Sequence, residues 1–369
     1  MPIKRTLTAT TLLLPLAGEA TAKPLAKVCG PGNKCIIGFS QANFAEPYRQ
    51  HVNNDLTARV KEIPQFELQI ADAAGNDNTQ VSQVENFTTQ GVDLLLISPF
   101  KAAPLTSAVT RVFQSGVPVI ELDRRTLGNN RTAFVGGDNT KIAYEAGAYT
   151  AKTLLPGGGE VAVLEGLPSS TPAIERLNGF KEGVKQNPKI TVVAEQAADW
   201  LPDKGQTVFA AMLQAHPDIQ VIYASNDLMA AGAYLAAKDA GKNNQVKIIG
   251  TDGLPGPAGG VASVASGQWA ATFVYPTGAA EALDLAKKIL LDCAETVPAV
   301  VTVPTQAVAQ ANEGAQCQAE ITRLPSLASL RGHGSLRSGQ RGLGAYPASR
   351  SDRGGDGVHG TLDGKALRK

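Results

Sequence analysis

Histidine, cysteine and aromatic residues are scarce in this sequence of 369 residues, which holds four histidines, four cysteines and 5% aromatic residues. The histidines are scattered along the chain, at His51, His216, His333 and His359, without the short spacing of metal ligands. Long apolar runs are also missing, because no stretch reaches about eighteen apolar residues, so we predict no transmembrane helix. These shortages argue against a haem or metal site, and we predict neither a metal nor a cofactor.

The signatures of common nucleotide-binding and hydrolytic enzymes are absent as well. There is no G-x-x-x-x-G-K-[ST] and no G-x-S-x-G, and the glycines of 157–159 precede a predicted strand instead of opening a helix toward a phosphate. The first strand-to-helix turn, 40–49, has no glycine, so the dinucleotide fingerprint is missing, although Asp72 could imitate its ribose-binding acid. This turn speaks against a nicotinamide-dependent sugar oxidoreductase, and we predict that the protein is not an enzyme.

Charge is unevenly distributed along the chain. The whole chain carries +1, of which residues 1–22 carry +1 and residues 319–369 carry +5, leaving −5 on residues 23–318. This mildly acidic body argues against a nucleic-acid partner. Residues 319–369 are rich in Gly, Ser and Arg and lack apolar periodicity, so we predict a disordered tail. A basic arm for anionic surfaces and an out-of-frame C-terminus are the alternatives.

The first 22 residues have the pattern of a secretory signal peptide. Lys4 and Arg5 precede an apolar segment over 7–17, and Ala-Thr-Ala at 20–22 matches a small-x-small cleavage site. We therefore predict export to the periplasm with a mature start at Lys23, against the alternative of a frayed cytosolic N-terminus.

Export favours disulfide bonds among the four cysteines, which fall into two pairs that are close in sequence. Four cysteines allow three connectivities, and buried free thiols are the competing interpretation. We predict two local bridges, Cys29–Cys35 and Cys293–Cys317.

Strands and helices alternate from Lys34 onward, which is typical of an α/β protein. The predicted strands are 35–39, 66–71, 94–98, 117–122, 160–164, 190–197, 221–224 and 247–251. The predicted helices are 47–60, 78–90, 102–114, 143–155, 174–186, 204–215 and 227–240. The order predicts two consecutive lobes, each with a parallel sheet flanked by helices, and a Gly-rich hinge over 135–139.

Polar and aromatic side chains follow the predicted strands at the points where the strands end. In GVPVIELDRR, residues 116–125, a short buried strand stops at Asp123, Arg124 and Arg125. Ligands of parallel sheets bind beyond the carboxyl ends of the strands, where a carboxylate beside a guanidinium suits a small neutral molecule rich in hydroxyls. Other strand ends carry Glu46, Tyr48, Arg49, Asp72, Asn76, Arg176, Trp200, Asn226 and Asp252.

Each of these residues also has an ordinary structural interpretation. An Asp–Arg pair can tie down a loop, Asn226 can cap the next helix, Asp252 can belong to a turn, and Tyr48 or Trp200 can be packing residues. Their shared position at one edge of two sheets favours a cleft between the lobes. Carboxylates, amides and guanidinium groups match vicinal hydroxyls, and flat rings match the C–H faces of a sugar.

The chain resembles the type I periplasmic sugar-binding proteins, which are ribose-binding-like receptors of ABC importers. The segments that carry the resemblance are GFSQANFAEPYR, GVDLLLISP, VPVIELDRR, IERLNGF, YASNDLMAAGAYLAAKDAG and IIGTDG, within about 34–303. The resemblance implies a monomeric receptor whose lobes close on a monosaccharide by hinge bending and which serves an ABC transporter permease. It also implies discontinuous lobes, 34–137 plus 276–302 and 138–275 plus 303–318, joined by three crossovers.

Within this family, Ser40-Gln41, Tyr48-Arg49 and AIER make the chain similar to the galactofuranose-binding branch. The ribose branch has two Phe in place of Tyr48-Arg49 and an Arg in place of Ile174, which argues against ribose and favours Arg176. The strand ends and the resemblance together predict the ligand contacts Glu46, Tyr48, Arg49, Asn76, Asp123, Arg124, Arg176, Trp200, Asn226, Asp252 and Tyr275. A receptor for a membrane sensor is also compatible, whereas a cytosolic regulator of this fold would need an N-terminal helix-turn-helix.

Overall fold

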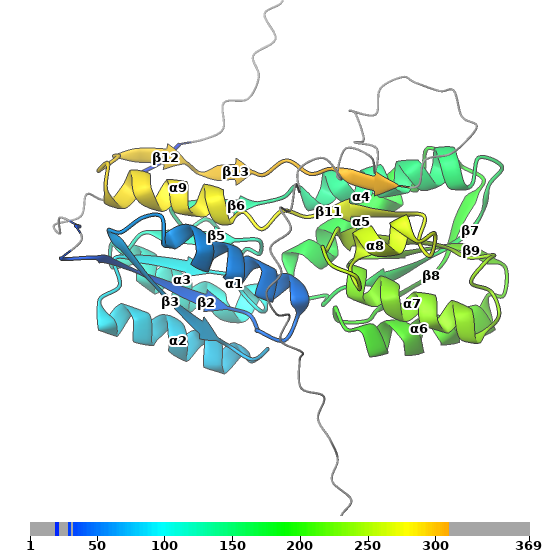
Figure 1. Ribbon diagram of the computed structural model, residues 1–369, viewed down its shortest axis with the longest axis horizontal. Helices are drawn as coiled ribbons and strands as arrows, with labels where there is room; N and C mark the ends of the chain where they lie inside the picture. The colour runs from blue at the N-terminus through cyan, green and yellow to red at the C-terminus, as the bar shows by residue number, and fades with distance from the viewer. Residues whose placement is uncertain (1–18, 22–28, 31, 310–369) are drawn as a thin grey trace, which may run out of the picture.

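The computed structural model describes residues 19–21, 29–30 and 32–309 and has two lobes arranged along its long axis (Figure 1). The strands of the first lobe are β2 (Cys35–Gln41), β3 (Phe66–Asp72), β4 (Leu94–Ile97), β5 (Val119–Leu122), β6 (Ala133–Gly136) and β13 (Val300–Thr302). Their order in the sheet is β13-β6-β5-β4-β2-β3, and all neighbouring strands are parallel.

The second lobe has a sheet of the same size. Its strands are β7 (Gly159–Glu165), β8 (Ile190–Ala197), β9 (Ile219–Ala224), β10 (Lys247–Asp252), β11 (Ala271–Val274) and β14 (Ala307–Ala309). Their order is β14-β11-β10-β9-β7-β8, and only the β11–β14 pair is antiparallel.

Helices flank both sheets. Those of the first lobe are α1 (Pro47–Val60), α2 (Asp77–Gln90), α3 (Ala102–Gln114) and α9 (Ala279–Leu290). Those of the second lobe are α4 (Asn139–Tyr149), α5 (Thr171–Val184), α6 (Pro202–Ala215), α7 (Asp227–Asp239) and α8 (Gly260–Ala265). The four residues of β4 are all buried, as expected for a parallel strand that is covered on both faces. The predicted α/β architecture with two lobes is confirmed.

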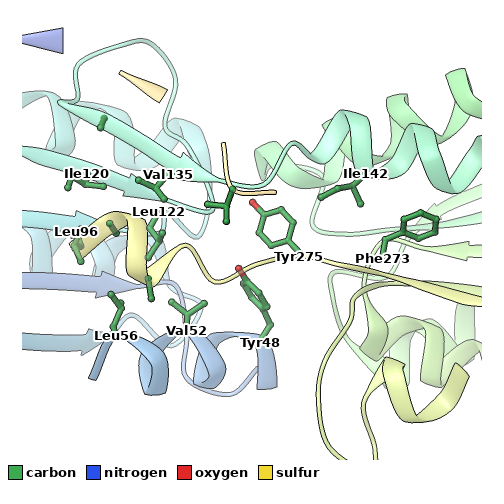
Figure 2. Packing of buried hydrophobic residues seen from close by; sticks show 14 of the residues in the cluster. Tyr48, Val52, Leu56, Leu96, Ile120, Leu122, Val135, Ile142, Phe273 and Tyr275 are labelled. Carbon is green, nitrogen blue, oxygen red and sulfur yellow. The ribbon is translucent and has the colours of Figure 1, made fainter. Parts of the chain in front are cut away.

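The chain passes between the lobes three times, after β6, after β11 and after β13. Tyr275 lies in the second passage, and Figure 2 shows its ring between the two lobes. Tyr48 packs edge-on against it, with ring centroids 5.7 Å apart. One apolar cluster therefore extends from the first lobe through these tyrosines to Phe273 and its neighbours in the second.

Several predicted elements differ from the structure at their ends. The helix predicted over 143–155 begins at Asn139, because the Asp138 side chain caps it by accepting from the Lys141 amide at 2.9 Å. Its last turn widens into a π-helix, Thr150–Leu154. The strand predicted over 117–122 begins only at Val119, because Pro118 has no N–H to donate to a ladder. Helices α8 and α9 and the short strands β6, β11, β13 and β14 were not predicted.

The predictions for the two ends of the chain and for the cysteines fall only partly on described residues. Strand β1 (Glu19–Thr21), inside the predicted signal peptide, pairs antiparallel with β12 (Thr296–Pro298). The predicted cleavage site at 22–23 and the tail 319–369 lie outside the described residues. The structure joins Cys29 to Cys35 with a Cα–Cα distance of 5.3 Å. Cys293 is exposed without a disulfide partner among the described residues, which do not include Cys317.

Candidate functional site

A small cavity of about 20 Å³, enough for about one water molecule, lies between the lobes at the carboxyl ends of the strands. The lining residues are Glu46, Tyr48, Arg49, Asp123 and Arg124 from the first lobe and Pro172, Arg176, Trp200, Asn226 and Asp252 from the second. The structure thus brings together nine of the eleven predicted ligand contacts. Pro172 was not predicted, although it lies in the same β7–α5 segment as Arg176.

Three of the lining residues have a backbone conformation that L-residues rarely adopt. The φ angles are 67° at Asp123, 71° at Trp200 and 123° at Asp252. Asp123 directly follows β5, Asp252 ends β10, and Trp200 lies three residues after the end of β8. Such strain persists only where the surrounding structure holds it, and it concentrates at binding and catalytic sites.

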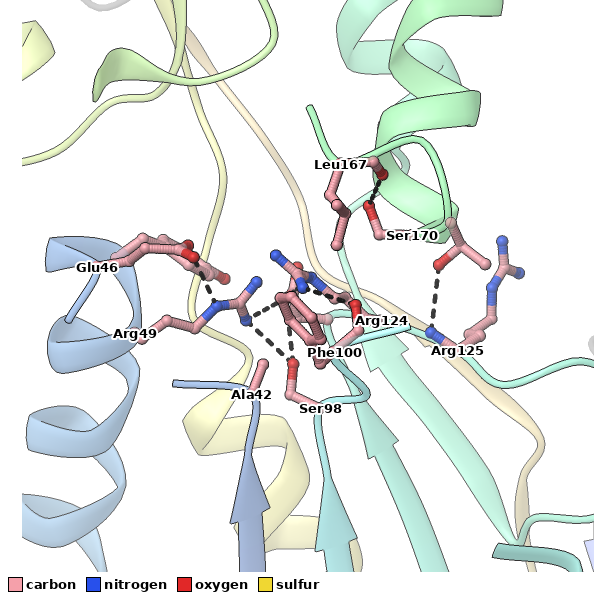
Figure 3. Close-up of polar contacts among 12 residues, drawn as sticks. Ala42, Glu46, Arg49, Ser98, Phe100, Arg124, Arg125, Leu167 and Ser170 are labelled. Atoms are coloured by element: carbon pink, nitrogen blue, oxygen red, sulfur yellow. Dashed lines mark hydrogen bonds and ion pairs between the residues drawn. The ribbon is translucent and has the colours of Figure 1, made fainter. Parts of the chain in front are cut away.

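On the first-lobe side, Arg49 and Asp123 form a buried ion pair. The Arg49 Nη1 lies 2.5 Å from Asp123 Oδ2 and 3.0 Å from Ser98 Oγ, to which it donates. The Arg49 Nε lies 3.7 Å from a carboxylate oxygen of Glu46. Figure 3 shows Arg49 between Glu46 at the start of α1 and Ser98 at the end of β4. Arg49 is therefore fixed by groups from three separate strand ends.

Arg124 reaches from the first lobe toward the second. Its Nη1 donates to the Phe100 carbonyl at 3.2 Å, and its guanidinium carbon lies 5.6 Å from the centre of the Trp200 ring. Arg176 from α5 lies 5.7 Å from the same ring. The indole of Trp200 consequently contacts one guanidinium from each lobe, an arrangement that also has cation–π character.

Arg176 is the corresponding fixed cation of the second lobe. Its Nε donates to Asn139 Oδ1 at 2.8 Å, and its Nη1 donates to the Ser225 carbonyl at 2.5 Å. The same Nη1 lies 3.4 Å from Asp252 Oδ1. The guanidinium also lies 4.7 Å from the centre of the Tyr275 ring. Arg176 thus contacts the hinge, the end of β9 and the end of β10 at once.

Asn226 both caps a helix and lines the cavity, and the sequence had suggested each of these two roles. Its Oδ1 accepts from the Met229 amide at 2.9 Å and so caps α7, while its Nδ2 donates to the Trp200 carbonyl at 3.2 Å. Since an amide nitrogen has two N–H groups, one donor stays available to the cavity that Asn226 lines.

Burial and neighbouring charges shift the two cavity aspartates in opposite directions. Burial raises the pKa of Asp123, but Arg49 and Arg124 outweigh it, so that this pKa lies below its ordinary value. Burial raises the pKa of Asp252 well above its ordinary value. The Arg176 guanidinium lowers this pKa only in part, and repulsion from the Asp227 carboxylate raises it further. Burial beside Arg49 lowers the pKa of Arg124 to about 10.

Three buried donors at the site have no hydrogen-bond partner among the described residues: Arg49 Nε, Arg124 Nε and Trp200 Nε1. A buried donor without an acceptor is costly, so an acceptor supplied by a ligand would be favourable here. The carboxylates of Asp123 and Asp252 supply acceptors nearby. Because a hydroxyl both donates and accepts, a compact polyol would satisfy both sets of groups.

Two predicted contacts do not line the cavity. Asn76 is exposed, and its side chain caps α2 by accepting from the Thr79 amide at 3.0 Å, so the structure gives it a local role. Tyr275 lies behind the cavity wall, where its hydroxyl donates to the Asp123 carbonyl at 3.3 Å and its ring contacts Arg176. Tyr275 positions lining residues from both lobes.

Neither a metal site nor a membrane span emerges from the described residues. No group of three or more His, Cys, Asp or Glu within them could hold a metal ion. None of the helices in that part of the chain is both long and apolar enough to cross a membrane.

The fold and the interlobe cavity define a solute-binding protein of the periplasmic type. Residues 37–292 match the family model of a periplasmic binding protein domain, and the chain belongs to this family. It is a binding protein and not an enzyme.

Known proteins similar to the chain bind sugars. The ribose import binding protein of Bacillus subtilis is 36% identical over 230 residues, which cover 62% of this chain and 73% of the relative. The galactofuranose-binding protein YtfQ of Escherichia coli is 27% identical over 260 residues, covering 68% and 78%. Among solved structures, the fructose-binding periplasmic domain of a hybrid two-component system has a TM-score of 0.72 at 35% identity, covering 75% of this chain and 91% of that one.

Proposed function

We propose that the protein captures a monosaccharide in the interlobe cavity and delivers it to the permease of an ABC importer. The observation that carries the proposal is the cavity itself, around which carboxylate and guanidinium groups of both lobes meet. A sugar that contacts both lobes at once favours their closed arrangement, which is a population shift. The moving units are 34–137 plus 276–302 and 138–275 plus 303–318, and the protein acts in the periplasm as a monomer after removal of residues 1–22.

We infer further that the sugar is a furanose of the galactofuranose type. Arg49, with Tyr48 beside it, takes a position in the cavity wall and is held by Asp123. This gives the first lobe two guanidinium groups, Arg49 and Arg124, that can bind adjacent hydroxyls. The similarity to a galactofuranose-binding protein supports the choice.

The test is a thermal-shift and calorimetric screen of the full chain against furanoses, pyranoses, pentoses and cyclitols. We expect galactofuranose-type sugars to raise the melting temperature most, and Asp252→Asn to weaken that shift. A protein whose melting temperature responds to none of these sugars would not be a monosaccharide receptor.

A second function, as the sugar-sensing receptor of a membrane sensor, is favoured by the similarity to the periplasmic domain of a two-component system. The two functions differ in the partner of the sugar-bound protein. Stimulation of the ATPase of a reconstituted importer supports transport, whereas sugar-dependent binding to a sensor ectodomain without that stimulation supports sensing.

A further inference from the structure

Beside the cavity, the lobes are joined by three further contacts, and these are made by residues that do not line the cavity. The Ala102 amide at the start of α3 donates to the Ser169 carbonyl at 3.1 Å. The Arg125 amide donates to Thr171 Oγ1 at 3.2 Å, as Figure 3 shows. The Arg125 guanidinium forms an ion pair with the Glu175 carboxylate of α5. None of these five residues lines the cavity.

Both ends of the ion pair are held in place within their own lobes. The Arg125 guanidinium carbon lies 4.9 Å from the centre of the Phe134 ring, on β6 of the first lobe. The Glu175 Oε2 accepts from Asn139 Nδ2 at 3.2 Å, within the second lobe. The side chains of Arg125 and Glu175 are 32% and 24% exposed, so water screens the pair only in part. The two groups are therefore positioned before they meet.

Asn139 connects this ion pair to the cavity. While its Nδ2 donates to Glu175, its Oδ1 accepts from the Nε of Arg176, which lines the cavity and contacts Asp252. A guanidinium only donates and a carboxylate only accepts, so an amide is the side chain that serves both neighbours. Asn139 is 2% exposed and is the first residue of α4, directly after the first passage between the lobes.

We propose that Arg125, Glu175 and Asn139 form an interlobe latch that slows release of the bound sugar. The proposal rests on the proposed function, since it assumes that the lobes close around a sugar. Arg125 and Glu175 lie on different lobes, so opening separates them and their attraction stabilises the closed arrangement alone. Asn139 couples the latch to the site because it positions Glu175 and Arg176 together. These are positioning residues that do not contact the sugar.

The first test compares sugar dissociation rates by stopped flow for Arg125→Gln, Glu175→Gln and the double variant. A partly exposed ion pair corresponds to roughly a twofold to fivefold faster dissociation when it is lost. The double variant should be no faster than either single variant. Glu85→Gln is the matched control, because Glu85 pairs with Arg111 inside the first lobe at 2.7 Å. Its dissociation rate should equal that of the wild type.

The second test separates the two bonds of Asn139. Asn139→Asp keeps an acceptor for Arg176 but places a carboxylate against Glu175, so dissociation should accelerate about tenfold. Adding Glu175→Gln restores a donor toward residue 139, and the Asn139→Asp/Glu175→Gln variant should return to the rate of Glu175→Gln. A merely structural role would give no such rescue.

The outcomes separate the latch from the proposed function. Faster dissociation in the Arg125 and Glu175 variants, with unchanged melting temperature of the sugar-free protein, supports the latch. Wild-type sugar binding with equal dissociation rates in all variants overturns the latch alone. A wild type that binds none of the sugars overturns the proposed function and the latch together.

Discussion

Asp123 and Asp252 face the same cavity but carry opposite electrostatic costs. The ion pair of Asp123 with Arg49, at 2.5 Å, keeps the Asp123 pKa below its ordinary value, so its charge is stabilised in the folded protein. Burial and the nearby Asp227 raise the pKa of Asp252, so its charge is penalised there. The two residues should therefore contribute alike to sugar binding and differently to stability.

Replacing each residue by asparagine separates these contributions. We expect both Asp123→Asn and Asp252→Asn to weaken sugar affinity at least tenfold, because a charge-assisted hydrogen bond contributes roughly 1.5–3 kcal/mol. Asp123→Asn should also lower the free energy of unfolding by roughly 3 kcal/mol, since it leaves the Arg49 charge buried without its partner. Asp252→Asn should leave that free energy unchanged or raise it at pH 8. Calorimetry and urea unfolding of the sugar-free proteins measure both effects.

A third buried carboxyl, Asp227, lies at the start of α7 behind the cavity. Its Oδ2 accepts from the Leu254 amide at 2.8 Å and its Oδ1 from Thr272 Oγ1 at 2.6 Å. Burial outweighs these bonds and raises its pKa from 3.8 to about 7. Asp227 ties the segment after β10 to the helix that Asn226 caps, so its ionisation affects the edge of the site.

The raised pKa of Asp227 predicts a pH dependence of stability. Because the folded-state pKa is the higher one, the folded protein binds more protons, and this stability is complete below about pH 4 and lost as the pH rises through about 7. The free energy of unfolding should fall between pH 5 and pH 8, and Asp227→Asn, whose side-chain amide does not titrate in this range, should flatten this fall. Asp218→Asn on the surface serves as the control. Parallel pH profiles for wild type and Asp227→Asn would contradict the assignment.

At the scale of elements, the close contact between α4 and α5 fixes the frame that carries Asn139, Glu175 and Arg176. A Cβ at Gly147 of α4 would lie 2.4 Å from the Phe180 carbonyl oxygen, and a Cβ at Gly183 of α5 would lie 2.2 Å from the Tyr144 carbonyl oxygen. The backbones of the two helices thus touch where these glycines lie. Glycine inside a helix costs up to about 1 kcal/mol relative to alanine, so its presence here reflects packing.

Gly147→Ala should test which of these effects is larger. The gain in helix propensity is at most about 1 kcal/mol, whereas the forced separation of two backbones should cost more, so we expect a net loss of roughly 1–3 kcal/mol in unfolding free energy. Gly157→Ala is the control, because no atom lies within 4 Å of the added Cβ. Urea unfolding measures both variants, and equal stabilities would show that α4 and α5 can move apart freely.

The sequence predicts those elements whose signals are local. The helix over 47–60 has the predicted ends because Pro47 marks its first turn. The helix over 102–114 has them because its buried residues Leu105, Ala108, Val109 and Val112 repeat at helical spacing. Residues 279–290 also carry a helical apolar pattern, at Ala282, Leu283 and Ala286, that could have placed α9. Strands β13 and β14 have three residues each, too few for a periodic signal, and form only because the chain returns to both sheets.

The residues of the site also divide into those with a local signal in the sequence and those without one. Asp123, Asn226 and Asp252 could be predicted because the carboxyl end of each strand is visible in the sequence. Asn139 could not, since its two bonds depend on the start of α4 lying against Glu175 and Arg176 of α5. Asn76 shows the converse, because a strand-end asparagine can equally be a helix cap.

At the scale of the whole molecule, the three passages between the lobes determine how the protein can open. Tyr275 in the second passage donates to the Asp123 carbonyl of the first lobe, and Tyr48 of that lobe donates to the Pro276 carbonyl at 3.1 Å. Both tyrosines are buried between the lobes. These two bonds tie the second passage to the first lobe, so opening must turn the lobes about this point.

Sugar binding should therefore make the whole molecule more compact. A hinge motion changes the distance between the lobes and leaves each lobe intact, so the radius of gyration from X-ray scattering should fall on saturation with sugar while the far-ultraviolet circular dichroism stays constant. Asp252→Asn at the same sugar concentration should remain at the sugar-free value, because the ligand then lacks one of its contacts on the second lobe. Glu175→Gln should compact at saturation but require a higher sugar concentration. An identical radius of gyration with and without sugar, in a protein that calorimetry shows to be saturated, would contradict hinge closure and leave binding to a rigid cleft.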